Sequence, residues 1–461
     1  MWVRAIAHTA VALSIAISGN HFVNGAGQTV RLLGVDREGT EYACQQGWAY
    51  SNGDDDAAAA AADAAAIAAW HANAVRVPLN EDCWLGINGQ PSYGSQSGYQ
   101  QMVETYVADL NADGIYAILD LHWSAPDATV ADGQRPMADD HSAAFWTSVA
   151  TAFKSNPAVV FDAFNEPYSP AANYADAANY PLTWGCWENG GCTLPTTVDG
   201  TDPGANPDTY QAVGMQALVT AIRDTGATQP ILLGGLSYSN DLSQWLTYEP
   251  DDPAHQLGAS LHSYEGEACA DTSCFSSEVA PVAAQVPVTI TEFDENPCAD
   301  ASDSFDANLM NWADQNGLGY LAWSWTSGAT PDCSDYYLVD QNGNAFAPNG
   351  TLLKAHLAAL AAASATTTPM TTTPTTTTTP SPVVSKPLRC VVPKLIGDTL
   401  KRARTLLRRA HCALGRASYH KPRARLSAKA RRRPPVVIKA TPARGRKLKA
   451  GTKVRLVLQR R

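Results

Sequence analysis

Two kinds of segment alternate along the chain before residue 364: short apolar runs, and longer runs whose apolar positions recur with helical spacing. The apolar runs predict strands at residues 30–35, 74–78, 115–121, 159–164, 230–233, 258–261, 286–290 and 318–323. Between most of them, helices are predicted at residues 56–70, 99–111, 141–153, 209–224 and 303–316. Strands this apolar need cover on both faces, so the alternation predicts a parallel sheet coated by helices.

Eight strand–helix units predict an α/β protein, a (β/α)8 TIM barrel over residues 13–363. A strand at residues 13–17 and a turn at residues 24–27 precede the first barrel strand. The alternative is an open doubly wound sheet. No Gly-x-Gly-x-x-Gly follows any strand, however, so dinucleotide binding has no support in the sequence.

The pattern changes at residue 364, where a Thr/Pro-rich stretch begins that runs to residue 387. Such a stretch buries no core and acts as an extended spacer. Beyond it, residues 388–461 predict a small α+β domain, with strands at 390–397, 435–441 and 452–459. A helix is expected at residues 398–415, capped by Asp398 or Thr399 and ended by Gly415.

Charge separates the two parts of the chain, whose net value is −11. Residues 386–461 carry 25 Lys and Arg and a single acid, Asp398, whereas the rest has 8 basic and 43 acidic residues. A surface this basic attracts anionic polymers with strong salt dependence. Its only aromatic residue is Tyr419, which disfavours a cellulose-binding role. A solvated spacer without specific affinity is the alternative reading, and a nucleic-acid partner is not expected.

Ten cysteines divide into eight before the spacer and two after it, an even number in each part. Even counts favour disulfides, and therefore an oxidising, extracytoplasmic setting, over buried thiols. The pairs Cys186–Cys192, Cys269–Cys274 and Cys390–Cys412 are expected, and the other pairings stay open. Residues 1–12 are interpreted as a remnant of a signal peptide, and no uncharged apolar run is long enough to span a membrane. We expect a secreted monomer.

Polar residues interrupt the apolar pattern where the strands end, which is where barrel enzymes carry their active sites. These residues are Arg76, His122, Asn165, Glu166, His262, Tyr264, Glu292 and Trp323. Singly, each has a structural explanation: Arg76 as a counter-ion, His122 as a core histidine, Glu166 as a helix cap. A structural role for all of them at once is much harder to accept.

Two carboxylates converging from the fourth and seventh strands suit retaining glycoside hydrolysis, in which one carboxyl protonates the leaving oxygen and the other attacks the anomeric carbon. Their pKa values must then be pushed in opposite directions. Arg76 is expected to keep the nucleophile ionised and Tyr264 to orient it. Asn165 is expected at the sugar 2-OH, the two histidines as neutral donors, and Trp323 as a flat face for the sugar ring.

At these positions the chain resembles glycoside hydrolase family 5 of the clan A retaining glycosidases, over about residues 13–360. The Asn-Glu-Pro motif at residues 165–167 carries the resemblance, and six further elements agree in order and spacing. They are Leu-Leu-Gly-Val (32–35), Val-Arg-Val-Pro (75–78), Asp-Leu-His (120–122), His-Ser-Tyr (262–264), Thr-Glu-Phe (291–293) and Ala-Trp-Ser (322–324).

The resemblance implies that Glu166 is the acid/base and Glu292 the nucleophile, and that the other six strand-end residues complete the active centre. Glu295 is a poor second candidate for the nucleophile because it lies beyond the apolar strand. The chain departs from the family pattern in the long loop at residues 168–206, beside the acid/base, which has its own cysteine pair.

The substrate follows less directly from the sequence. Five tryptophans fall in strand-end loops, where aromatic faces would suit a polymeric β-glycan; they are Trp48, Trp84, Trp123, Trp184 and Trp187. The alternative is that about half of them pack in the core. We expect an endo-acting β-1,4-glucanase, with mannan, xylan and other β-glycans, or a non-catalytic carbohydrate-binding protein, as alternatives. No cofactor or metal is expected, since the acidic patch at residues 54–56 lacks the alternation of a calcium loop.

The basic tail resembles a PASTA domain, a small module known from bacterial cell-wall kinases and penicillin-binding proteins. The resemblance rests on Val-Pro-x-Leu-x-Gly at residues 392–397, the amphipathic helix expected after it, and the ending Gly-Thr-Lys-Val-Arg-Leu-Val-Leu at residues 451–458. It implies that the tail contacts peptidoglycan or another anionic cell-wall polymer.

Overall fold

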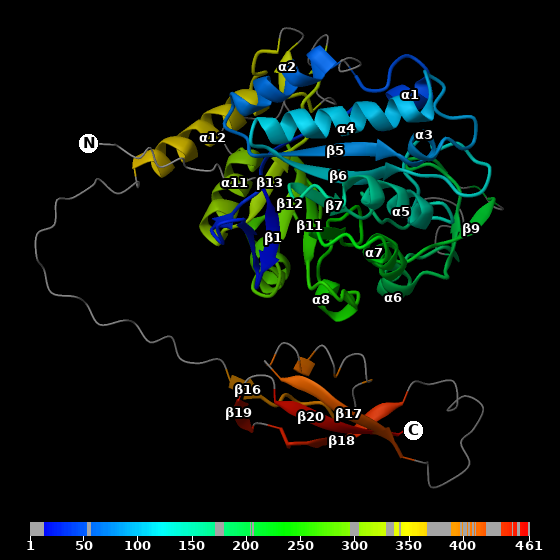
Figure 1. Ribbon diagram of the computed structural model, residues 1–461, viewed down its shortest axis with the longest axis vertical. Coiled ribbons are helices and arrows are strands. Elements are labelled where there is room, and N and C mark those ends of the chain that lie inside the picture. The colour runs from blue at the N-terminus through cyan, green and yellow to red at the C-terminus, as the bar shows by residue number, and fades with distance from the viewer. Residues whose placement is uncertain are drawn as a thin grey trace, which may run out of the picture. The chain divides into compact units, whose positions relative to one another are not determined.

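Eight parallel strands close into a barrel in the computed structural model of the protein, which confirms the predicted (β/α)8 fold (Figure 1). Their order around the barrel is β4 (Leu33–Asp36), β5 (Ala74–Asn80), β6 (Tyr116–Trp123), β7 (Val159–Asp162), β10 (Ile231–Gly234), β11 (Leu257–Tyr264), β12 (Val288–Asp294) and β13 (Gly319–Ala322). Strand β13 pairs with β4 and closes the ring.

The structure describes residues 13–52, 57–170, 179–202, 204, 207–295, 304–328, 336–340, 343–366, 389–396, 399, 403, 406–407, 410, 412–420, 435–444, 446–449 and 452–459. Contacts divide the chain into two units, Met1–Thr368 and Pro369–Arg461. The predicted signal-peptide remnant, most of the Thr/Pro spacer and the acidic patch at residues 54–56 lie outside the described residues.

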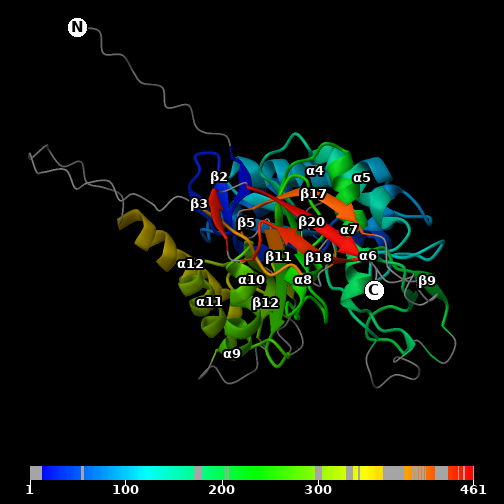
Figure 2. The same ribbon diagram turned by 90° about the horizontal axis from the view of Figure 1, so that it is seen from below.

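The outer layer of the first unit consists of helices that follow the barrel strands. The longer ones are α2 (Ala57–Ala68), α4 (Gln96–Ala112), α5 (Ser142–Phe153), α7 (Met215–Asp224), α11 (Phe305–Asn316) and α12 (Asn349–Thr366). Side-chain caps fix the starts of two of them: Ser95 accepts a hydrogen bond from the backbone N–H of Gly98 in α4, and Ser304 accepts one from that of Ala307 in α11. Helices α11 and α12 lie on one side of the barrel, and α4 and α5 on another (Figure 2).

Shorter helical segments occupy the loops at both ends of the barrel. They are α1 (Ala43–Gln46), α3 (Glu81–Leu85), α6 (Trp184–Asn189), α8 (Trp245–Tyr248), α9 (Thr272–Cys274), the π-helical turn Phe275–Val279 and α10 (Ala280–Ala283). Two small two-stranded sheets pair β8 (Thr193–Pro195) with β9 (Thr209–Gln211) and β14 (Ser327–Gly328) with β15 (Val339–Asp340). Among the described residues, no helix combines the length and apolar character needed to span a membrane.

Two elements predicted in the first unit were wrong in their boundaries. The strand expected at residues 30–35 is two strands, because Thr29–Val30 (β3) pairs back onto β2 (His21–Asn24) before the barrel strand begins at Leu33. The helix expected at residues 209–224 begins only at Met215, because residues 209–211 form β9. In both cases the local pattern assigned these residues to the element that follows them. In the structure they form a short antiparallel strand instead.

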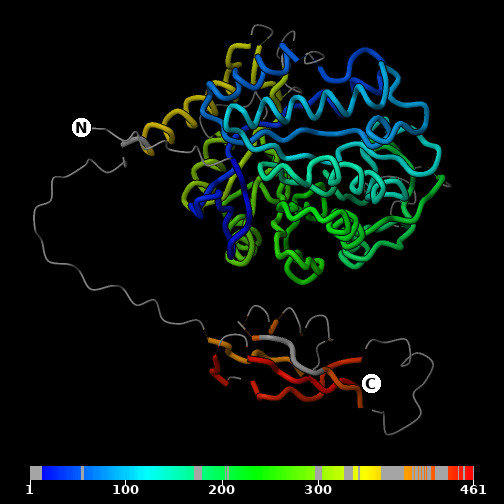
Figure 3. Tube along the Cα trace, viewed as in Figure 1, coloured from blue at the N-terminus to red at the C-terminus, as the bar shows by residue number. Residues whose placement is uncertain are grey.

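The antiparallel sheet of β1 (Ile15–Ser18), β2 and β3 covers the amino end of the barrel (Figure 3). Ile15 and Phe22 from this sheet join a buried cluster with residues at the starts of barrel strands, among them Ala74, Ala158 and Leu232. The backbone N–H of Ile15 also donates to the carbonyl of Pro157. The sheet thereby closes the end of the barrel opposite the polar strand ends.

Disulfides join all eight described cysteines. The pairs Cys186–Cys192, Cys269–Cys274 and Cys390–Cys412 form as predicted. The fourth, Cys44–Cys83, links α1 to α3, a pairing that the spacing alone left open. Cys298 and Cys333 lie outside the described residues.

The second unit contains a three-stranded sheet in which β20 (Lys453–Gln459) lies between β17 (Ala413–Tyr419) and β18 (Val436–Thr441). A second pair joins β16 (Arg389–Val391) to β19 (Lys447–Lys449). One face of the sheet buries Val454, Leu456 and Leu458. The helix predicted to run to Gly415 was too long, because β17 begins at Ala413; of that helix the described residues show only positions 403, 406 and 407 as helical.

Candidate active site

Glu166 and Glu292 meet at the carboxyl end of the barrel. Glu166 follows β7 and Glu292 lies within β12; a carboxylate oxygen of each and a ring nitrogen of His262 all lie within 4.8 Å of one another. His262 Nδ1 is 2.7 Å from Glu166 Oε1 and 3.3 Å from Glu292 Oε2. A register shift between Leu261 and His262 in β11 places this side chain between the two acids. The sequence-predicted pair of acids therefore shares one site.

Arg76, on β5, is fully buried beneath this pair. Its Nη1 lies 2.6 Å from Glu292 Oε1, and its Nη2 donates to Asn165 Oδ1 at 2.7 Å. It also forms ion pairs with three further buried carboxylates, those of Asp36, Asp120 and Asp162, each at 3.0 or 3.1 Å. One guanidinium thus faces four carboxylates.

A single positive charge cannot compensate four buried negative charges, so protons must make up part of the difference. Burial raises the pKa of Asp120 to about 7 and that of Asp162 to about 8, although Arg76 opposes both shifts. Burial also raises the pKa of Asp36 well above its ordinary value. Among these acids Glu292 has the shortest contact with Arg76. Within this cluster, Glu292 is therefore the acid that lies nearest to the positive charge.

Tyr264 and Asn165 complete the surroundings of the two acids. The Tyr264 hydroxyl donates to Glu292 Oε2 at 2.8 Å, and proximity to that acid together with burial raises the pKa of the phenol. Asn165 uses its oxygen to accept from Arg76, while its Nδ2 is buried and has no hydrogen-bond partner within the described part of the chain. That N–H group is available to a ligand above Glu166.

Glu166 occupies a different environment from Glu292. Its side chain is buried, and this burial raises its pKa to about 7, against an opposing hydrogen bond from Gln134. Gln134 Nε2 donates to Glu166 Oε2 at 3.0 Å. Burial also lowers the pKa of His262 to about 3, so its imidazole is neutral and interacts with the acids as a hydrogen-bonding group rather than as a cation. A carboxyl with a pKa near 7 suits a proton donor at neutral pH.

His122 and Trp323 lie side by side, with nearly parallel rings whose centroids are 5.4 Å apart. His122 Nδ1 is 2.7 Å from Asp120 Oδ2, and burial lowers the pKa of this histidine to about 3. The structure thus brings all eight sequence-predicted residues to the carboxyl end of the barrel. Their individual roles in a reaction stay predictions.

Several residues that belong to this site were missed in the sequence. Asp36, Asp120 and Asp162 stand in apolar strands, which was a usable signal because an ionisable group there needs a buried partner. Gln134 lies in a loop that follows β6, and nothing in its local sequence points to Glu166. Glu267, whose Oε2 accepts from the Tyr264 backbone N–H, was also missed; burial, Glu166 and Glu292 raise its pKa to about 7.

The loop tryptophans behave mostly as the core alternative predicted. Trp84, Trp184 and Trp187 are buried, and their expected role in lining a cleft was wrong for these three. Trp48 is 46% exposed and Trp123 is half-buried, and both rings pack against Tyr42. Only these two of the five can present an aromatic face to a ligand.

Glu295 takes part in local structure. Its carboxylate accepts from the Ser304 hydroxyl and from the Asp306 backbone N–H at the start of α11. Within the described ranges, one group of side chains has the spacing to hold a metal ion, and it consists of Glu166, His262 and Glu292. The same three side chains are those that the reaction considered below would use directly.

The family model of cellulase, glycosyl hydrolase family 5, matches residues 26–329, about two thirds of the chain. The chain belongs to glycoside hydrolase family 5. The protein is therefore a glycoside hydrolase, and its family supports an endo-β-glycanase that acts on a polysaccharide. No curated protein sequence matches the chain.

Solved structures agree on the fold of this family 5 enzyme. A β-glucanase from Saccharophagus degradans in complex with cellotetraose is similar with a TM-score of 0.53 at 16% identity, over 78% of this chain and 98% of that one. The catalytic domain of a mannanase from Streptomyces sp. SirexAA-E is similar with a TM-score of 0.47 at 21% identity, over 74% and 89% of the two chains. At 16% identity, the likeness to the β-glucanase concerns the barrel fold alone.

Proposed function

We propose that the protein is a retaining endo-β-glycanase with Glu166 as acid/base and Glu292 as nucleophile. One observation carries the proposal: carboxylate oxygens of the two residues lie within 4.8 Å of each other, with Arg76 bound to Glu292 and Gln134 bound to Glu166. Retaining enzymes hold their carboxyl groups about 5–5.5 Å apart, whereas inverting enzymes need about 6.5–9.5 Å to admit a water molecule. The observed proximity favours direct attack by a carboxylate.

In the first step Glu292 attacks the anomeric carbon while the protonated Glu166 donates its proton to the departing glycosidic oxygen. Arg76 and Tyr264 hold Glu292 by both carboxylate oxygens, which fixes the direction from which it attacks. In the second step the ionised Glu166 takes a proton from water, and the resulting hydroxide breaks the glycosyl–Glu292 ester. Asn165 Nδ2 is placed to donate to the sugar 2-OH, a contact that strengthens in the transition state.

The substrate we propose is β-1,4-glucan. The family is that of cellulases, and the structurally similar β-glucanase from Saccharophagus degradans was crystallised with cellotetraose. The stacked pair of His122 and Trp323 at the acids, and Trp48 and Trp123 farther along the loops, offer flat apolar faces to successive sugar rings. Mannan or xylan is the second candidate substrate, because the residues at the two acids do not by themselves select one β-glycan.

The test is hydrolysis of soluble β-1,4-glucan, mannan, xylan and β-1,3-glucan by the purified protein, with reducing ends counted and the anomeric product followed by NMR. We expect cleavage of β-1,4-glucan with a β-configured first product. Glu166→Gln and Glu292→Gln should each lower kcat by orders of magnitude while the thermal midpoint stays close to that of the unmodified protein. An α-configured first product, or full activity of the double variant, would refute the mechanism.

We also propose that the protein is secreted and that its basic second unit retains it on an anionic cell-wall polymer. The disulfides support an oxidising compartment. Exposed cationic side chains on the described strands of this unit, Arg389, Lys439, Lys447, Lys449, Lys453 and Arg455, support an anionic partner.

A binding assay on purified bacterial cell walls tests this retention, with the full-length chain compared with a chain that ends at Thr368. We expect only the full-length chain to be retained, with a smaller retained fraction at about 0.5 M salt than at about 0.05 M. Equal binding of both chains would show that the second unit is not the anchor.

A further inference from the structure

Strand β10 supplies none of the eight predicted site residues. The turn that follows it, however, contacts the backbone on either side of Glu166 and the backbone of His262. This turn, residues 235–241, is called the β10 turn below. It is closed by reciprocal backbone hydrogen bonds between Leu236 and Asp241. Three consecutive residues within it have left-handed backbone angles: Ser237, Tyr238 and Ser239, with φ of 55°, 60° and 58°.

Left-handed φ is unfavourable for residues with a side chain, and a run of three such residues persists only where the surroundings impose it. The surroundings here are the catalytic strands. Ser239 is buried, and its Oγ donates to the backbone carbonyl of Asn165 at 2.8 Å, one residue before Glu166. The Tyr238 backbone N–H donates to the carbonyl of Pro167 at 3.1 Å, one residue after Glu166. The β10 turn therefore holds the acid/base segment from both sides.

The same turn holds the strand that carries His262. The carbonyl of Ser239 accepts from the backbone N–H of His262 at 3.2 Å, and Asn240 Nδ2 donates to the carbonyl of His262 at 2.8 Å. Asn240 is buried and also binds Cys269 twice, as donor to its carbonyl and as acceptor from its N–H at 2.8 Å. One buried amide thus joins the end of β11 to the loop that follows it.

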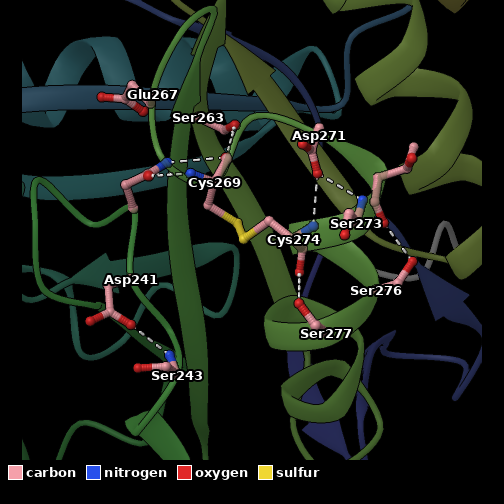
Figure 4. The surroundings of a disulfide bond; sticks show 12 residues. Asp241, Ser243, Ser263, Glu267, Cys269, Asp271, Ser273, Cys274, Ser276 and Ser277 are labelled. Atoms are coloured by element: carbon pink, nitrogen blue, oxygen red, sulfur yellow. Dashed lines mark hydrogen bonds between the residues drawn. A yellow bond between two sulfur atoms is a disulfide. The ribbon is translucent and has the colours of Figure 1, made fainter.

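The loop beyond Tyr264 is fixed at the same point. Cys269 forms a disulfide with Cys274, and its carbonyl also accepts from the Ser263 hydroxyl at 2.6 Å (Figure 4). Asp271 in turn accepts from the backbone N–H groups of Ser273 and Cys274 (Figure 4). Asn240 therefore bonds to a residue, Cys269, that the disulfide and the Ser263 hydroxyl also hold in place.

A glycine at the end of β10 leaves room for this turn. Gly234, the last residue of β10, has no side chain, and a Cβ there would overlap the Ser239 hydroxyl and crowd the carbonyl of Asn165. The close approach of Ser239 to the acid/base strand thus depends on a glycine at this position.

We propose that Ser239 and Asn240 are positioning residues, which set the distance between the acid/base Glu166 and His262 by tying both of their backbones to one strained turn. This inference rests on the proposed function, because the geometry that they set matters only if Glu166 transfers protons. Neither residue touches the reacting atoms. Their effect is transmitted through the backbone of Asn165 and of His262.

The first test replaces Ser239 by Gly, and uses Ser237→Gly as a matched control. Both substitutions put glycine at a left-handed position, which glycine tolerates, but only the first removes a hydrogen bond to the acid/base segment, since Ser237 is exposed. We expect kcat to fall by about ten- to a hundredfold in Ser239→Gly with KM within about twofold, and no change in Ser237→Gly. Wild-type kcat in Ser239→Gly, or an equal loss in both variants, would overturn the proposal.

The second test replaces Asn240 by Asp, which keeps the oxygen that accepts from Cys269 but removes the N–H donors to the carbonyls of His262 and Cys269. The matched control is Asn73→Asp. Asn73 makes the same kind of amide bridge at the amino end of the barrel, to the backbone of Arg31 and Leu33. Both variants are expected to lose some thermal stability. Only Asn240→Asp should move the basic limb of the pH profile of kcat/KM upward, because His262 withdraws from Glu166 and no longer stabilises its carboxylate.

The pH profile separates the outcomes. An unchanged basic limb in a folded Asn240→Asp variant, or the same shift in Asn73→Asp, would overturn the proposal. Lack of hydrolysis of any β-glycan by the unmodified protein would instead refute the proposed function, and it is detected before either variant is made.

Discussion

His262 Nδ1 lies 2.7 Å from Oε1 of Glu166, although along the sheet His262 is the register partner of Glu292. The imidazole therefore reaches from β11 toward the acid that follows β7, and lies closer to it than to Glu292 on the neighbouring strand. With a pKa lowered by burial to about 3, it stays neutral while either acid changes its charge. His262 can thus hydrogen-bond to Glu166 in both states of the proposed cycle without adding a competing cation.

The pH dependence of the reaction follows from Glu166. Burial raises its pKa to about 7, and it must be protonated to act as the acid. We therefore expect kcat/KM on β-1,4-glucan to be high below pH 7 and to fall as pH rises through about 7, since this ratio reports the free enzyme. Initial rates at low substrate concentration between pH 4 and 10 measure this decrease of kcat/KM. A limb that begins above pH 9 would show that another group supplies the proton.

Gln134 tunes the same carboxyl. Its amide donates to Glu166 Oε2 and so favours the ionised form, against burial. Gln134→Leu removes the donor at similar volume, so the basic limb of kcat/KM should move to higher pH, with a shift of roughly half to one unit. Gln211→Leu, at an exposed amide bound to Thr193 Oγ1, is the control and should leave the limb in place. A downward shift would contradict the assigned direction of the hydrogen bond.

Arg76 cannot be replaced by Lys without loss. Its three nitrogens reach four carboxylates and Asn165, an arrangement that a single ammonium group cannot reproduce. We expect Arg76→Lys to lower kcat at least about a hundredfold and to destabilise the fold by about 3–5 kcal/mol, the usual cost of breaking a buried ion pair. Turnover and urea unfolding measure the two effects.

Arg223→Lys is the matched control for this substitution. Arg223 binds Asp252 through two nitrogens, in a pair remote from the acids. It should lose stability and keep its kcat. Full activity in Arg76→Lys would show that the nucleophile does not depend on the guanidinium.

A second acidic pair outside the site should make stability depend on pH. Burial and the neighbouring Glu295 raise the pKa of Asp306 to about 8, and burial and Asp306 raise that of Asp294. An aspartate with a raised folded-state pKa stabilises the fold below about pH 4, and this contribution is lost as pH rises through about 8. Asp306→Asn fixes the neutral form, so its thermal midpoint should fall less than that of the wild type between pH 4 and 8. Thermal midpoints that change equally with pH in the wild type and in Asp306→Asn would contradict this assignment.

The barrel could be predicted because its strands are short, mostly apolar runs and each is followed by a helix or a loop of adequate length. The boundaries that were wrong, at residues 30–35 and 209–214, are places where short antiparallel pairing wins over local pattern. In the second unit, residues 413–415 join β17, which pairs in parallel with β20, rather than the expected helix. Such pairing depends on partners distant in sequence, which periodicity does not report.

Seven of the eight predicted site residues were found because they lie close to the carboxyl end of a strand, where the fold fixes their direction. Arg76, the third residue of β5, stands out instead as a charge inside an apolar strand. Gln134, Ser239 and Asn240 lie in loops, and their contacts with Glu166, Asn165 and His262 depend on how those loops fold back. Among the tryptophans, Trp48 and Trp187 have the same loop setting in the sequence, yet one is exposed and the other buried. Loops lack the regular hydrophobic periodicity of helices and strands, so the burial of a loop residue cannot be predicted from the sequence pattern.

The complete burial of Arg76 and its carboxylates has a consequence for how the two units respond to solution conditions. Mobile ions cannot enter that cluster, so added salt should leave turnover nearly unchanged while acidity controls it. The exposed cations of the second unit follow the opposite rule, since they keep their charge over the whole neutral range and are weakened by every added counter-ion. Acidity would therefore govern how fast the enzyme works, and salinity where it stays.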